Sequence, residues 1–77
     1  MNGTVVIELH QKFAVQLEDK SWCLLKPLER CDIRIGDVLS GKLNEKGCCE
    51  ILNTNCNSLI NAEIMSVTKY VPLFPKD

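Results

Sequence analysis

Apolar and polar residues alternate along most of this chain with a period of two, which is typical of half-buried β-strands. In the first stretch, Val5, Ile7 and Leu9 are expected to face a core, and in the second Phe13 is expected on the core side. The alternation predicts six short strands, at residues 5–9, 13–17, 22–26, 38–43, 48–52 and 59–67.

Turn-forming residues separate these stretches. Residues 18–21 and 44–47 are polar and suit tight turns, and the second of these segments ends in glycine. Pro27 ends the third stretch because proline cannot donate to a central ladder. Residues 27–35 lack strand character, and we expect at most one helical turn there, over residues 28–31. Gly41 predicts a bulge or a sharp bend inside the fourth strand.

The fold class that follows is all-β, a small five- to six-stranded OB-like barrel. A chain of 77 residues has room for one domain. Closure into a barrel also removes the exposed edge strands that invite aggregation. We expect the barrel to occupy residues 1–70 and a tail to occupy residues 71–77. The alternation alone leaves both an OB-like and an SH3-like strand order open.

Three segments carry a resemblance to a known superfamily: Gly3-Thr4-Val5-Val6, Phe13-Ala14-Val15-Gln16-Leu17-Glu18-Asp19 and Ile33-Arg34-Ile35-Gly36-Asp37-Val38. Their order resembles the RNA-binding OB domains of ribosomal and translation-factor proteins, over about residues 3–43. The resemblance implies an OB barrel that binds RNA, with base-stacking aromatic residues on its second and third strands. The sequence departs from that pattern, because Phe13 falls on the core side and Lys20 stands where the family often has glycine.

Charge limits the nucleic-acid interpretation. The chain has nine basic and ten acidic residues and a net charge of −1, whereas dedicated nucleic-acid binders are usually strongly basic. A local patch would therefore have to supply the affinity. The candidate residues lie in the half of the chain that forms the binding face of OB barrels; they are Lys12, Trp22, Lys26, Arg30 and Arg34.

In that hypothesis the lysines and arginines contact phosphates and Trp22 stacks on a base. The competing interpretation is that the basic residues are solvated surface and that Trp22 covers the core. The discriminating feature is the placement of the positive charges, since nucleic acid is favoured if the four basic residues converge beside an exposed Trp22. The adaptor interpretation is favoured if acidic and polar residues share that face, because acidic groups would repel phosphate. The residues to compare are Glu8, Gln16, Glu18 and Glu50.

Metal binding and catalysis are not expected. The five cysteines are odd in number and lack a Cys-x-x-Cys motif, so we expect reduced thiols, no metal site and no cofactor. His10 is the only histidine and lies on the polar side of its stretch, so no Cys–His nucleophile pair is indicated. The start of the chain has no basic segment ahead of an apolar run, and no stretch reaches the roughly 20 apolar residues of a membrane span. We expect a cytoplasmic protein without enzyme activity or membrane contact.

The sequence thus predicts a non-enzymatic binding module for single-stranded RNA or DNA on an OB-fold face. The alternative is a protein–protein interaction or adaptor barrel. The apolar, proline-bearing segment at residues 70–75 is able to dock on its own barrel or on a second copy, so we expect a monomer or a weak homodimer.

Overall fold

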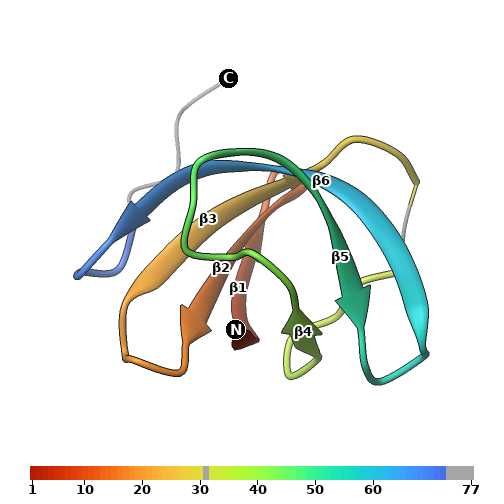
Figure 1. Ribbon diagram of the computed structural model, residues 1–77, viewed down its shortest axis with the longest axis horizontal. Coiled ribbons are helices and arrows are strands. Elements are labelled where there is room, and N and C mark those ends of the chain that lie inside the picture. The colour runs from red at the N-terminus through yellow and green to blue at the C-terminus, as the bar shows by residue number, and fades with distance from the viewer. Residues whose placement is uncertain (31, 73–77) are drawn as a thin grey trace.

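The computed structural model describes residues 1–30 and 32–72. Six strands form a closed barrel in the order β1-β2-β3-β6-β5-β4, in which every neighbouring pair is antiparallel (Figure 1). The strands are β1 (Asn2–Leu9), β2 (Lys12–Leu17), β3 (Trp22–Pro27), β4 (Val38–Ser40), β5 (Gly47–Asn53) and β6 (Ser58–Thr68). The predicted all-β barrel is therefore confirmed, with six strands.

Two local predictions differ from the structure. The fourth strand was expected to run to residue 43 but ends at Ser40, because the backbone of Gly41 has a positive φ of 158° that leaves the strand conformation. The described part of the segment 28–31 contains no helical turn, and no described residue belongs to a helix that is long and apolar enough to cross a membrane. Residues 73–77 of the expected tail lie outside the described residues.

The core fills the inside of the barrel with side chains from all six strands and from two loop residues, Ile33 and Leu43. Phe13 belongs to this core, as its position in the alternation predicts. Side chains of β2 occupy the space beside Gly3 of β1, since an added Cβ would stand 2.6 Å from Cγ1 of Val15 and 2.9 Å from Cδ2 of Leu17. The glycine therefore permits close packing of the first two strands.

A β-bulge in β1 changes which residues face the core. Val5 pairs with Val15, but the register shifts after Val5, so that Ile7 pairs with Ala14 and Glu8 pairs with Phe13. Ile7 was expected on the core side together with Val5. Because of the bulge, Ile7 lies on the outer side of the sheet, next to Ala14. Glu8, next to Phe13, takes the position that faces the core side at the end of the strand.

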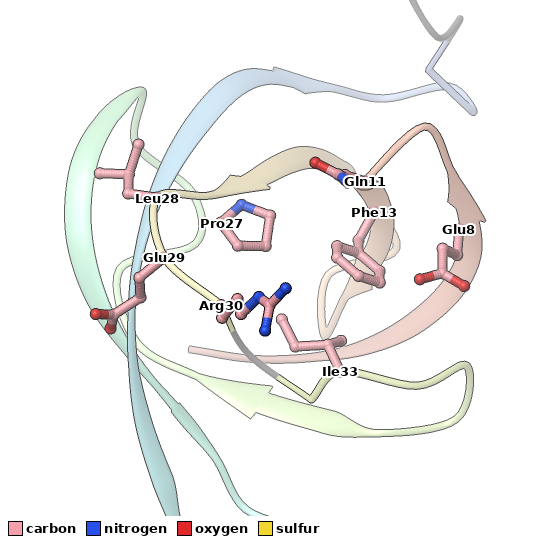
Figure 2. Close-up of a pocket in the computed structure, with 8 residues that line it drawn as sticks. All are labelled: Glu8, Gln11, Phe13, Pro27, Leu28, Glu29, Arg30 and Ile33. Carbon is pink, nitrogen blue, oxygen red and sulfur yellow. The ribbon is translucent and has the colours of Figure 1, made fainter.

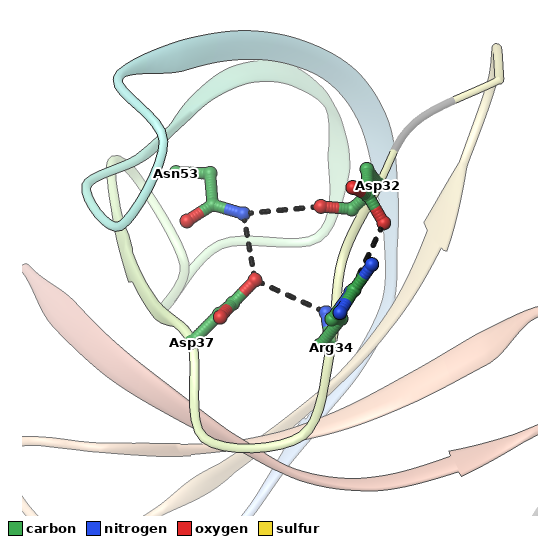
Figure 3. Close-up of polar contacts among 4 residues, drawn as sticks. All are labelled: Asp32, Arg34, Asp37 and Asn53. Carbon is green, nitrogen blue, oxygen red and sulfur yellow. Dashed lines mark hydrogen bonds and ion pairs between the residues drawn. The ribbon is translucent and has the colours of Figure 1, made fainter.

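A polar clip holds the loop before β4 against the end of β5 (Figure 3). Asn53 is fully buried, and its Nδ2 donates to Oδ2 of Asp37 at 2.9 Å and to the carbonyl of Asp32 at 3.4 Å. Its Oδ1 accepts from the N–H of Asn55 at 3.1 Å. The same loop continues onto β1, where the N–H of Val5 donates to the carbonyl of Asp37 at 2.9 Å. These bonds fix the segment that brings Ile33 to the barrel end.

Candidate binding site at the end of the barrel

A recess of about 460 Å³ opens at the end of the barrel where β1 joins β2 and where β3 ends (Figure 2). We call it the barrel-end recess; it is lined by Glu8, Gln11, Phe13, Pro27, Leu28, Glu29, Arg30 and Ile33. Its size falls within the range of about 300–1,000 Å³ that is usual for small-ligand sites. Three segments that are far apart in the sequence contribute to it: the β1–β2 hairpin, the end of β3 with the residues that follow it, and the loop before β4.

The floor of the barrel-end recess is apolar. Phe13 and Ile33 are 5% and 6% exposed and belong to the core, so they close the recess from below. Pro27 is half-buried beside them, and Leu28 is exposed on the rim. An apolar group that enters the recess therefore meets the core of the barrel directly.

The walls carry three charged side chains with different surroundings. Glu29 points away from the middle of the recess, and its Oε1 accepts from the N–H and from Nδ2 of Asn61 at 3.3 and 3.5 Å. The guanidinium of Arg30 points toward the middle, above the apolar floor (Figure 2). Glu8 lies on the opposite wall. Within the described chain, neither Arg30 nor Glu8 forms a side-chain hydrogen bond or an ion pair, so both remain available to a ligand.

The rim of the recess includes a strained turn. His10 and Gln11 form the two-residue connection between β1 and β2, with φ values of 53° and 60°. Positive φ at both central residues defines a type I′ turn, which strongly favours Asn-Gly and costs free energy for other residues. The turn places Gln11 on the recess wall. The strained backbone of this turn therefore lies at the barrel-end recess, and strained backbone of this kind is common at ligand-binding sites.

Three of the five residues proposed from the sequence lie on the outer side of β2 and β3. Cys23 and Leu25 point into the core, so alternation turns Trp22 and Lys26 outward. Trp22 is half-buried, and Lys26 is exposed opposite Glu63 of β6. Lys12 is only 7% exposed.

The other two candidates lie elsewhere. Arg30 belongs to the barrel-end recess. Arg34 is exposed in the loop before β4, and its Nε donates to Oδ1 of Asp32 at 3.4 Å. The structure therefore distributes the five residues over three surroundings: the outer side of β2 and β3, the recess, and the loop before β4.

Sequence reasoning missed most of the recess. Glu8 was assigned to the outer side because the alternation of β1 conceals the bulge. Gln11 and Ile33 were not proposed, since only folding brings the hairpin and the loop together. One signal was present: residues 27–35 form a stretch without strand character that nevertheless contains apolar and charged residues, as binding loops often do.

The four cysteines that the structure describes do not extend the site, and Cys31 lies outside the described residues. Cys23, Cys48, Cys49 and Cys56 are free thiols, and none of them lines the barrel-end recess. Burial, with a smaller contribution from nearby Cys49, raises the pKa of the Cys23 thiol to about 12, so this group is unreactive in the folded state. Over the described residues, no three histidine, cysteine or acidic side chains lie close enough to hold a metal ion.

The barrel-end recess thus combines an apolar floor with two charged groups that have no partner within the described residues. Its interpretation rests on this geometry and on the chemistry of its residues. Comparison of the chain with protein-family models, with curated proteins and with solved structures finds no match.

Proposed function

We propose that this chain is a non-enzymatic binding module that binds a segment of a partner protein in the barrel-end recess. The observation that carries the proposal is the Arg30 guanidinium, which points into the recess above Phe13 and Ile33 and has no acidic partner within the described residues. The exposed lining of the recess is more polar than apolar, and polar groups of this kind fix the orientation of a ligand.

The charge arrangement favours a protein partner over nucleic acid. Lys26 lies opposite Glu63, Arg34 bonds to Asp32, and Arg30 shares the recess with Glu8. Lys26 and Arg34 thus each have a carboxylate in their surroundings, and a phosphate backbone that approaches either of them would meet negative charge as well. Mixed charge around an apolar centre is the pattern of a protein interface.

We propose binding rather than catalysis for the recess. The described lining residues, which do not include position 31, contain no cysteine, serine, threonine or histidine, so they offer no hydroxyl, thiol or imidazole nucleophile or base. Its two carboxylates lie on different walls, and one of them is occupied by Asn61.

A relationship to OB domains has a smaller part in the proposal. The antiparallel β1-β2-β3 meander and the pairing of β1 with β4 support it. The OB fold is a five-stranded Greek-key barrel, however, whereas this barrel has six strands that are antiparallel throughout. We therefore base the function on the recess and not on the fold.

Amide shift mapping of the ¹⁵N-labelled protein tests the proposal. One series of titrations uses peptides selected by display on the folded protein, and a second uses mixed-sequence single-stranded RNA and DNA at low and moderate salt. We expect the peptides to shift residues of the hairpin and of the segment after β3. Saturable oligonucleotide shifts at Lys12, Trp22 and Lys26 that weaken with salt, without peptide shifts at the recess, would instead establish the nucleic-acid interpretation.

A further inference from the structure

We infer that the barrel-end recess recognises the carboxyl-terminal residue of its partner, with the terminal carboxylate on Arg30 and an apolar terminal side chain on the floor. The inference rests on the proposed function and adds the chemical groups by which the recess recognises its partner. It follows from the order of groups across the recess: a cationic wall, an apolar floor and an anionic wall.

Arg30 supplies the group for the carboxylate. A guanidinium presents paired N–H donors in a planar fork that matches the two oxygens of a carboxylate. The Arg30 side chain directs this fork to the middle of the recess, and no described residue engages it. A hydrogen bond between this guanidinium and a carboxylate is charge-assisted, which makes it stronger than a bond between neutral groups.

The floor and the opposite wall supply the rest of the recognition. Pro27 and Leu28, together with the small exposed parts of Phe13 and Ile33, offer apolar surface to a terminal side chain. Glu8, across from Arg30, is an acceptor for the backbone N–H groups that precede the terminal carboxylate. A carboxyl-terminal residue carries all three elements, namely a carboxylate, an apolar side chain and an N–H donor, within the dimensions of one residue.

A chain end fits the shape of the recess better than an internal segment does. Phe13 and Ile33 belong to the barrel core and close the bottom of the recess, so a chain end that points inward stops against them. An internal segment would instead have to lie across the opening, past Leu28 and Gln11. A terminal residue needs no exit.

The test compares peptides that differ only at their end. Fluorescein-labelled peptides from a display library with free carboxyl termini are titrated by polarisation, each as the free acid and as the terminal amide. Matched variants are Arg30→Gln, which removes the charge, and Arg34→Gln, which makes the same change in the exposed loop outside the recess. Circular dichroism and thermal unfolding confirm that both variants are folded.

We expect the amide to bind about 10- to 100-fold more weakly than the free acid, and Arg30→Gln to remove this difference while Arg34→Gln preserves it. Equal binding of acid and amide, with shifts still at the recess, would overturn terminal recognition and leave the proposed function in place. The absence of recess shifts with any free-acid or internal display peptide would overturn both.

Discussion

Replacement of Asn53 by aspartate is the most direct test of the polar clip that holds the loop before β4 against the end of β5. Asn53 and aspartate have nearly the same shape, so the substitution leaves packing unchanged. It keeps the oxygen that accepts from the Asn55 N–H at 3.1 Å but replaces the Nδ2 donor, which lies 2.9 Å from Oδ2 of Asp37, with a second carboxylate oxygen. The side chain at this position is fully buried, so water cannot relieve the loss.

The expected loss at pH 7 is about 2–4 kcal/mol of unfolding free energy, because a buried donor is removed and a carboxylate is left in a buried site. For a domain of this size each kcal/mol corresponds to about 4–8 °C in Tm. Asn53→Ala serves as the comparison: it removes the same donor without adding charge, and we expect a smaller loss of about 1–3 kcal/mol.

The contribution of these carboxylates to the free energy of unfolding changes with pH in opposite directions in the natural chain and in Asn53→Asp. In the natural chain the bond from Asn53, followed by a backbone bond from Arg34, lowers the pKa of Asp37. A lowered folded pKa contributes stability that is present above the unfolded pKa of about 3.9 and is lost as the pH falls through the folded value. In Asn53→Asp the two carboxylates share a proton, so the pKa of the pair is raised, and its contribution is present at low pH and lost as the pH rises.

Urea unfolding followed through Trp22, the single tryptophan, measures both effects between pH 7 and pH 4. We expect the stability gap between the natural chain and Asn53→Asp to narrow steadily as the pH falls. A gap below 0.5 kcal/mol at pH 7, or a gap that is constant across this range, would refute the role assigned to the clip.

Three further predictions concern other parts of the structure. Replacing His10-Gln11 by Asn-Gly should raise the free energy of unfolding by about 1 kcal/mol, because the type I′ turn at these positions favours that pair. An unchanged Tm would contradict the assignment of backbone strain to this turn. Gly3→Ala should destabilise by about 1–3 kcal/mol in urea melts, since the new Cβ would meet Val15 at 2.6 Å, and a neutral result would mean that β1 shifts freely. In maleimide labelling at pH 7.5, Cys48 should react within the mixing time while Cys23 reacts only on unfolding, as mass spectrometry of the peptides would show; equal rates would disprove the burial of Cys23.

The sequence predicted the strands more accurately than it predicted the site. Alternation locates a strand because one face must be buried, and this placed Phe13 in the core correctly. It failed at Ile7, because one extra residue in the bulge reverses the faces that follow without leaving a mark on the local pattern. The same reversal is what brings Glu8 to the recess.

Arg30 was proposed from the sequence, but for a phosphate rather than for a pocket. Its neighbours across the recess come from the β1–β2 hairpin and from the loop that Asn53 fixes, and no local sequence pattern encodes such long-range proximity. Of the other candidates, Lys26 lies near Lys12, which is only 7% exposed, whereas Trp22 lies at the opposite end of β3 beside Gln16. Whether they bind a ligand is the subject of the oligonucleotide titration proposed above.

The shortness of β4 has a consequence for how the barrel opens. Within the strands, only Val38–Ser40 joins β1 to β5, and a few backbone bonds of the flanking loop residues extend this seam, whereas β5 and β6 pair along the whole length of β5. Local opening follows the elements with the fewest protected amides, so deuterium should enter first along this seam and last along β6. The protein would then unroll from a closed cylinder into an open curved sheet hinged on the β3–β6 ladder, well before it unfolds.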